Sequence, residues 1–217
     1  MNVKHAAVLA GVLFVMVLVA RWIAEETPTI PVRGPAPDSF TVAFATSVGD
    51  FEVTFDRASS PVAVDRVYQL ARIGFWAGAR IYRVNERYAQ FGYSGDPELD
   101  AVWVPAGIPD ETVAGSNVRG SVSFARGGVG TRSTILFINR LDNTNLDDIS
   151  WNGVRGFPPV GLVSSGMEVV DKLFSGYGDS PMQWEDSIAA VGNRFLDREY
   201  PELDSITGVR LVDDQGR

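Results

Sequence analysis

The chain has 217 residues and a net charge of −8 at neutral pH, with no cysteine and a single histidine, His5. These counts exclude thiol catalysis and cysteine-based metal sites, and they leave no histidine cluster or histidine-dependent triad for the globular part. An acidic domain is also not expected to bind nucleic acid or an anionic bilayer through its charge. Carboxylates are numerous enough to leave a carboxylate-pair hydrolase open on composition, although no spacing singles out a pair.

The N-terminal segment, residues 1–26, combines a short basic start with an apolar run. Lys4 precedes a run of fifteen residues without a polar side chain, which ends before Arg21 and Trp22. This length lies between that of a signal peptide and that of a membrane span. Large side chains precede the candidate cleavage sites, and an arginine beside a tryptophan is typical of a membrane interface. We therefore predict an uncleaved signal anchor, with a cleaved signal peptide or a buried core helix as alternatives.

The charge and proline content around this segment predict where the domain lies. Lys4 on the short flank places the N-terminus inside and the domain outside. The expected location is extracytoplasmic, in a periplasm or at a cell surface, or secreted if the signal is cleaved. Residues 27–38 contain four prolines and predict a semi-rigid linker. The remaining residues, 39–213, are enough for one domain with a well-buried core.

The pattern of apolar residues predicts mostly short strands. Residues 40–44 and 51–55 alternate as in a β-hairpin. Ser60 and Pro61 then provide an N-cap and a first-turn proline for a helix that stops at Gly74. Further elements are strands at 80–84, 121–125, 135–139, 159–163 and 206–212 and a second helix at 166–174. Together they predict an all-β dominated domain, built as a closed barrel capped by two α-helices.

Three stretches carry a recognisable motif. Residues 81–97 read IYRVNERYAQFGYSGDP, residues 119–139 read RGSVSFARGGVGTRSTILFIN, and residues 161–173 read GLVSSGMEVVDKL. In this order and at about this spacing, they resemble the signature blocks of bacterial cyclophilins, the peptidyl-prolyl cis/trans isomerases. The resemblance covers about residues 39–213. It implies an eight-stranded antiparallel barrel with a helix over each open end, and a monomeric enzyme that needs no metal or cofactor and acts on proline-containing polypeptides.

The chemistry of an X–Pro bond explains why an arginine matters in such an enzyme. Resonance holds the bond planar with a barrier of about 18–20 kcal/mol, and uncatalysed exchange takes tens to hundreds of seconds. At the twisted transition state the prolyl nitrogen regains a lone pair. A donor aimed at this nitrogen stabilises the twisted state more than either planar state. Arginine suits this role because it stays protonated and presents several rigid N–H donors.

The resemblance assigns roles to eight residues of this chain. Arg83 matches the catalytic arginine of the family. The implied substrate-binding residues include the glutamine before the glycine-rich turn, the walls and floor of the proline pocket, and a backbone segment beside the substrate. These residues are Tyr88, Gln90, Ala125, Arg126, Phe137, Leu146 and Phe157.

This chain departs from the best-known members at three positions and in one loop. Ile135 stands where glutamine is usual, which removes a partner that could position Arg83. Asn145 replaces a tryptophan, and Phe157 stands where histidine is usual. The loop before Gln90 is one residue shorter than usual, so the pocket-wall aromatic could align one position after Tyr88, which would then serve ordinary barrel packing.

Residues 177–205 extend the minimal pattern and resemble an extension in a bacterial subgroup of cyclophilins. We expect a short helix packed on the barrel, with a partner-docking element as the alternative. For the whole chain, the favoured hypothesis is a membrane-tethered isomerase that assists the folding of exported proteins. The alternatives are a cyclophilin-fold module that binds proline-containing segments with weak catalysis, and an unrelated all-β ligand-binding domain.

Overall fold

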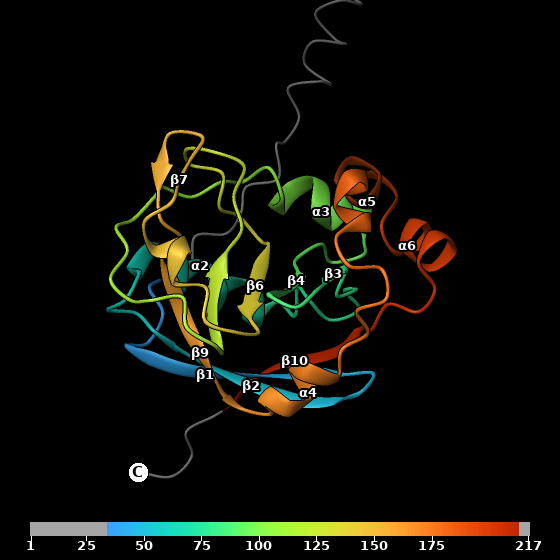
Figure 1. Ribbon diagram of the computed structural model, residues 1–217, viewed down its shortest axis with the longest axis horizontal. Coiled ribbons are helices and arrows are strands. Elements are labelled where there is room, and N and C mark those ends of the chain that lie inside the picture. Colours follow the sequence, from blue (N-terminus) through green and yellow to red (C-terminus); the bar gives the residue numbers. More distant parts are fainter. Residues whose placement is uncertain (1–33, 213–217) are drawn as a thin grey trace, which may run out of the picture. The chain divides into compact units, whose positions relative to one another are not determined.

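A single antiparallel sheet forms the framework of the computed structural model, which describes residues 34–212 (Figure 1). Its strands are β1 Ser39–Thr46, β2 Gly49–Asp56, β3 Arg83–Val84, β4 Tyr88–Phe91, β5 Ser121–Phe124, β6 Leu136–Asn139, β9 Pro159–Ser165 and β10 Ile206–Val212. From edge to edge they follow the order β10, β1, β2, β9, β5, β6, β4, β3. Two further short strands, β7 Ser150–Trp151 and β8 Val154–Arg155, pair with each other.

Helices accompany the sheet in larger number than the two predicted to cap the barrel and the short one expected in 177–205. The α-helices of the described residues are α2 Pro61–Arg72, α3 Pro97–Trp103, α4 Met167–Lys172, α5 Glu185–Val191 and α6 Asn193–Glu199, and the 3-10 helices are η1 Thr144–Asp147 and η2 Ser180–Trp184. The two predicted helices correspond to α2 and α4. Within residues 34–212, no helix has the length and hydrophobicity needed to cross a bilayer. The predicted anchor at 1–26 lies outside the described residues.

The sheet does not close into the predicted barrel. Its edge strands, β10 and β3, do not pair with each other, so the fold is a half-barrel. The chain before β3 meets the chain before β10 at a single bridge, between Arg80 and Ser205. The strand predicted at 80–84 is only two residues long, and the free edge of its last residue, Val84, is bridged by Gly178 instead. The prediction of a closed barrel is therefore wrong.

The hairpin predicted at 40–44 and 51–55 is confirmed as β1 and β2. Phe44 and Phe51 lie opposite each other in the ladder, are fully buried, and stack with ring centroids 5.0 Å apart. Alternating apolar residues on both strands therefore fill the same side of the sheet, as a strand periodicity of two requires.

Helix α2 confirms the first predicted helix, but its cap comes from a distant residue. The side chain of Ser60 makes no capping hydrogen bond. The carboxylate of Glu111 instead accepts hydrogen bonds from the backbone N–H groups of Val62 (2.8 Å) and Ala63 (3.1 Å) and from the Ser60 hydroxyl (2.5 Å). Glu111 thus satisfies the free N–H groups of the first turn and ties α2 to the loop between α3 and β5.

Elements β4 and α3 are among those that have no counterpart in the prediction. The last three residues of β4 are all buried, so the strand lacks the alternation on which the prediction depended. Helix α3 begins where the sequence indicated only a glycine-punctuated turn. The side chain of Asp96 accepts a hydrogen bond from the N–H of Glu98 (2.9 Å), and Pro97 occupies the first helical position.

Residues 177–205 form three helical segments, η2, α5 and α6, in place of the one short helix expected. Figure 1 shows α5 beside α3 and α6 on the far side of α5, and α5 contacts both. The segments bury an apolar cluster, separate from the rings of β1 and β2, against the residues just before β3 and just after β4. Its fully or largely buried members are Tyr82, Tyr93, Ile188, Phe195, Leu196 and Tyr200. The extension therefore packs directly against the part of the sheet that carries Arg83.

Candidate active site

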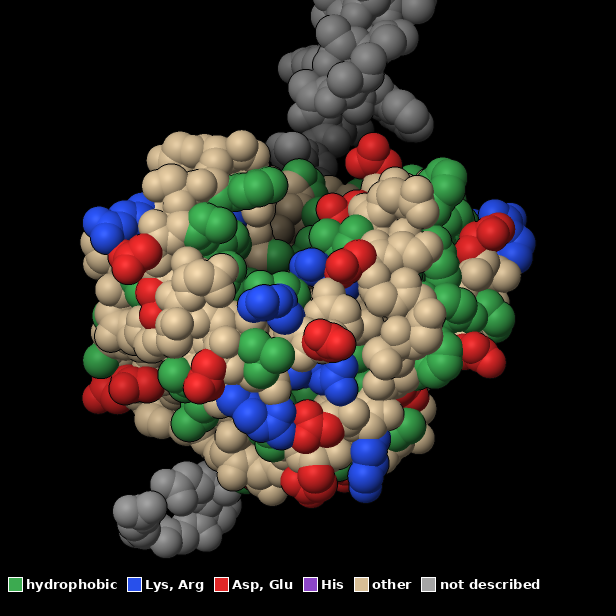
Figure 2. All heavy atoms as spheres, viewed as in Figure 1, with side chains coloured by type: hydrophobic (Ala, Val, Ile, Leu, Met, Phe, Trp, Pro, Cys, Tyr) green, Lys and Arg blue, Asp and Glu red, His purple; other side chains and the backbone are tan. Residues whose placement is uncertain are grey.

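A pocket of about 510 Å³ lies over β3, β4 and β6 and beside the end of β5, and all eight residues marked out by the sequence line it. Figure 2 shows the face of the molecule hollowed near its centre, with basic, acidic and hydrophobic side chains around the hollow. The lining contains Arg83, Tyr88, Gln90, Ala125, Arg126, Phe137, Leu146 and Phe157. It also contains residues that the sequence did not single out: Val104, Gly127, Thr131, Ser133, Ile149, Trp151, Met182 and Glu185.

Aromatic side chains form one half of the pocket. Phe137 lies on β6 and is only 5% exposed, so it forms the floor. The rings of Tyr88 and Phe157 meet it edge-on, at centroid distances of 5.4 and 6.0 Å. Leu146 is buried on η1, and Trp151 is half-exposed on β7. This half is an apolar space with rigid walls, of the kind that receives a small apolar ring.

The loop that carries Leu146 is held in place by buried amides and one carboxylate. Asp147 accepts hydrogen bonds from the Ser116 hydroxyl (2.5 Å) and from the backbone and side-chain nitrogens of Asn117 (2.8 and 2.7 Å). Asn143 donates to the side-chain oxygen of Asn139 on β6 (2.8 Å). This network fixes the rim of the pocket to the sheet. Asn145, by contrast, is exposed and does not line the pocket.

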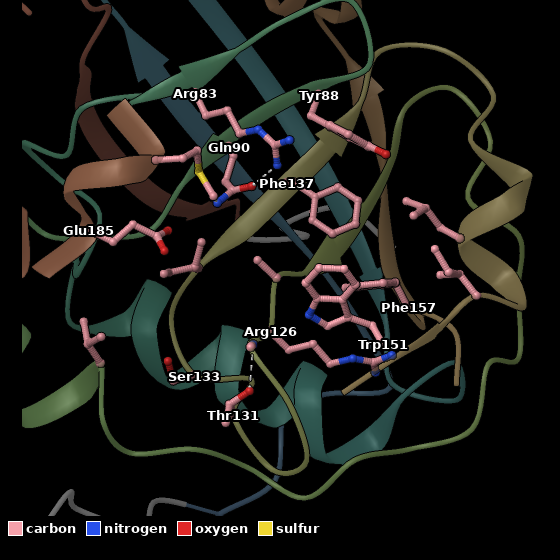
Figure 3. A pocket seen from close by; sticks show the side chains of 17 residues that line it. Arg83, Tyr88, Gln90, Arg126, Thr131, Ser133, Phe137, Trp151, Phe157 and Glu185 are labelled. Atoms are coloured by element: carbon pink, nitrogen blue, oxygen red, sulfur yellow. Dashed lines mark hydrogen bonds between the residues drawn. The ribbon is translucent and has the colours of Figure 1, made fainter. Parts of the chain in front are cut away.

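Arg83 lies at the edge of this aromatic half. It pairs with Gln90 across the β3–β4 ladder, so the two side chains emerge on the same side of the sheet. The Nη1 group of Arg83 donates to Oε1 of Gln90 (3.1 Å), and its Nε group donates to Oδ1 of Asp179 (2.6 Å). The guanidinium group also lies 4.9 Å from the ring centroid of Tyr88. Figure 3 shows it directed toward the side of the pocket where Tyr88 and Phe137 lie.

Arg126 is a structural part of the pocket wall. Its side chain is fully buried, and burial lowers the pKa of its guanidinium group. It donates to the backbone oxygens of Gly156 and Val154 and lies under the ring of Phe157 (Figure 3). The carboxylate of Asp110 is 3.9 Å away. Arg126 therefore holds the wall segment in place and does not present a free charge to the pocket.

The 177–205 extension contributes Met182 and Glu185 to the lining of the pocket opposite the aromatic half. Met182 accepts a weak hydrogen bond through its sulfur from Nε2 of Gln90 (3.6 Å). Glu185 accepts a hydrogen bond from the buried hydroxyl of Tyr82 (3.1 Å), and burial raises the pKa of its carboxyl group. In residues 34–212, no three His, Cys, Asp or Glu side chains are placed to hold a metal ion.

Three polar or polarisable residues of this extension that contact Arg83 or line the pocket were not found from the sequence. Ile135 lines the pocket where a glutamine partner for Arg83 is usual, yet Arg83 has two polar partners, Gln90 and Asp179. No motif marks Asp179, Met182 or Glu185, and no periodicity brings them to β3. The fold of 177–205 brings Met182 and Glu185 to the pocket lining and Asp179 to Arg83.

Comparisons with known proteins agree with this arrangement. The family model for cyclophilin-type peptidyl-prolyl cis-trans isomerases matches residues 41–193. Among solved structures, a cyclophilin-type isomerase from Cryptosporidium parvum superposes with a TM-score of 0.57 at 16% identity, over 81% of this chain and 99% of that one. A structure of the same protein in the presence of the dipeptide Ala-Pro gives the same TM-score over 80% and 99% of the two chains, also at 16% identity. The cyclophilin AquaCyp293 from Hirschia baltica gives 0.54 at 16% identity over 84% and 77%.

The family match spans most of the described residues and includes the strands that form the pocket floor. On this match the chain belongs to the cyclophilin-type peptidyl-prolyl cis-trans isomerases. At 16% identity the solved structures show the shared fold.

Proposed function

We propose that this protein is an active prolyl isomerase in which Arg83 is the catalytic residue. The observation that carries the proposal is the hydrogen bonding of the Arg83 guanidinium group. Two of its nitrogens, Nε and Nη1, donate to Asp179 and Gln90, whereas Nη2 makes no hydrogen bond within the described residues. The group lies beside the aromatic half of the pocket, against the Tyr88 ring. One donor of a fixed fork is thus available to a prolyl nitrogen seated there.

The proposed mechanism assigns the other lining residues to binding. Phe137, Tyr88, Leu146 and Phe157 receive the proline ring, with Arg126 holding the Phe157 wall. Gln90 and the backbone at Ala125 align the peptide. As the X–Pro bond twists, the nitrogen becomes pyramidal and accepts a hydrogen bond from Arg83 that neither planar isomer can make. This differential interaction lowers the barrier without breaking a bond.

A second candidate, a module that binds proline-containing segments with weak catalysis, is favoured by one observation. The carboxylate of Asp179 lies 2.6 Å from Nε of Arg83 and compensates part of its charge. A partly neutralised arginine stabilises the transition state less, while the aromatic pocket still binds proline.

The cellular role we propose follows from the sequence. Residues 1–26 anchor the chain in a membrane, residues 27–38 space the domain from it, and residues 39–213 form the isomerase domain, with 177–205 as the extension of a bacterial subgroup. The domain lies in a periplasm or at a cell surface, acts as a monomer and assists the folding of exported proteins. A reporter enzyme active only outside the cytoplasm, fused after residue 38, tests this topology. Loss of the reporter signal would contradict it.

The experiment that separates the two functions measures exchange and binding in the same sample. Full-length protein is added to an X–Pro peptide, and cis–trans exchange is followed by NMR exchange spectroscopy, with and without a chelator. We expect acceleration that the chelator does not change. Binding of the peptide by a folded protein that gives no acceleration would favour the binding module.

A further inference from the structure

The strand that carries Arg83 is short and lies at an edge of the sheet, and the 177–205 extension covers that edge. On one side β3 pairs with β4, and on its other side Val84 is bridged by Gly178. The following 3-10 helix, η2, contacts β3. An edge strand of two residues has few ladder hydrogen bonds to fix the direction of its side chains. The contacts of the extension with its free side supply additional support.

The extension reaches Arg83 directly through Asp179. Oδ1 of Asp179 accepts from Nε of Arg83 (2.6 Å) and also from Nδ2 of Asn85 (2.7 Å). Asn85 and Arg83 lie two residues apart, so one carboxylate oxygen holds two side chains of the same edge. A charge-assisted bond to Nε restricts the rotation of the planar guanidinium group.

The extension also reaches Arg83 indirectly, through a chain of hydrogen bonds that ends at Glu185. Nη1 of Arg83 donates to Oε1 of Gln90, and Nε2 of Gln90 donates to the hydroxyl of Tyr82 (2.7 Å). That hydroxyl donates in turn to Oε1 of Glu185 (3.1 Å). Every bond in this chain runs in the same direction, from the guanidinium group to a carboxylate. The orientation of Gln90 is thereby fixed, with its oxygen toward Arg83 and its nitrogen toward Tyr82.

We propose that the 177–205 extension is a functional part of the active site, in which Asp179 and Glu185 are positioning residues that hold Arg83 from two sides. This inference rests on the proposed function of Arg83. Asp179 occupies Nε of the guanidinium fork, and Gln90, which Glu185 orients through Tyr82, occupies Nη1. The third arm, Nη2, is left for the substrate. Ile135 stands where a glutamine that could position Arg83 is usual, and it offers no polar group. Asp179 and Glu185 position Arg83 in its place.

A second ion pair of the extension serves as a matched control, because it tests whether losing any surface ion pair lowers turnover. Asp197, also in the extension, accepts a hydrogen bond from Nε of Arg80 (2.8 Å) and is 52% exposed at its side chain, against 62% for Asp179. Arg80 lies three residues from Arg83 but does not line the pocket. Asp179→Ala and Asp197→Ala therefore remove similar ion pairs from the same extension, and only the first touches Arg83.

The test combines a double-mutant cycle with a direct view of the Arg83 side chain, all in the full-length protein. We expect Asp179→Ala to lower turnover by about ten- to a hundredfold with little change in peptide affinity, because a misplaced donor acts mainly on the transition state. Glu185→Leu should lower it by a smaller factor. Asp197→Ala should keep wild-type turnover. In an Arg83→Ala background, Asp179→Ala should have no further effect. The Arg83 Nε–H signal in an NMR spectrum should lose its protection from solvent exchange in Asp179→Ala alone.

The possible outcomes separate this inference from the proposed function. Wild-type turnover in Asp179→Ala, or an equal loss in Asp197→Ala, would overturn the positioning role while leaving Arg83 as the catalytic residue. An equal loss from Asp179→Ala with and without Arg83 would show that Asp179 acts on stability or binding instead. A wild-type protein without isomerase activity would overturn the proposed function, and with it the positioning role.

Discussion

The guanidinium carbon of Arg126 lies 4.4 Å from the ring centroid of Phe157, and the same group donates to the backbone oxygens of Val154 and Gly156, just before that residue. The wall of the pocket is thus held by a buried cation. Arg126→Met keeps most of the volume but removes the donors and the cation–π contact. We expect a loss of about 1–3 kcal/mol in the free energy of unfolding, measured by urea denaturation, and weaker binding of an X–Pro peptide.

The exposed cation Arg194 provides a comparison for that variant. Arg194→Met lies outside the pocket lining and should leave peptide affinity unchanged. Unchanged affinity in Arg126→Met as well would show that Arg126 has no part in holding the Phe157 wall.

Phe137→Ala should reduce both stability and substrate binding. Phe137 is 5% exposed and contacts two other rings, so its truncation leaves a cavity at the pocket floor. We expect a loss of about 3–5 kcal/mol in the free energy of unfolding and a higher KM. Phe137→Leu, which fills more of the space, should lose less in both measurements. A Phe137→Ala variant with wild-type KM would remove this ring from the proline pocket.

The cap of α2 should make stability depend on pH. Burial alone would raise the pKa of Glu111, but hydrogen bonds from Ser60, Val62, Ala63 and Arg132 outweigh it, so the pKa lies below its ordinary value. A carboxyl group with a lowered folded-state pKa contributes stability above its unfolded-state pKa of about 4.3, and this contribution is lost as the pH falls through the folded-state value. Glu111→Gln should therefore cost about 1–3 kcal/mol at pH 7 and less below pH 4.

Urea denaturation of wild type and Glu111→Gln at both pH values measures this difference. The exposed Glu202, changed to Gln, serves as the control and should alter stability little at either pH. A cost for Glu111→Gln that stays the same at low pH would contradict the role of the carboxylate charge in the cap.

Gly92→Ala should destabilise the turn that follows Gln90. Gly92 has φ +152°, and a Cβ atom there would lie 2.3 Å from Cα of Ile135 and 2.8 Å from the backbone oxygen of Thr134. Backbone atoms cannot move aside cheaply, so we expect a loss of about 2–4 kcal/mol in the free energy of unfolding. Gly127→Ala is the control, because no atom lies within 4 Å of its Cβ position. Equal stability of the two variants would contradict this packing.

Local sequence patterns predicted the elements whose burial alternates or follows a helical period. The hairpin of β1 and β2 and the helix α2 are such elements, and both are confirmed. Strand β4 was missed because three successive residues of it are buried, so its sequence does not alternate. The prediction of a closed barrel was wrong because β3 is only two residues long and does not pair with β10. Both outcomes depend on tertiary contacts that periodicity does not contain.

The residues of the site likewise divide into those that the sequence predicted and those that it could not. Eight lining residues could be found because they match positions in the pattern of a known family, and the structure brings all eight to one pocket. Asp179 and Glu185 could not be found, because their importance arises from where the extension folds back on β3. The cap from Glu111 was missed for the same reason: it joins positions about fifty residues apart, and Ser60 offered a nearer candidate.

The turnover of Arg83→Ala, compared with wild type at matched thermal stability, tests the central claim most directly. If Nη2 of Arg83 stabilises the twisted prolyl nitrogen, turnover should fall by about 10²–10³, equivalent to about 2.7–4 kcal/mol, while peptide affinity stays close to that of wild type. Arg83→Lys should restore little, because a single ammonium group cannot be held by Gln90 and Asp179 and still reach the substrate. Turnover near the wild-type value in Arg83→Ala would contradict the account and remove Arg83 from the mechanism.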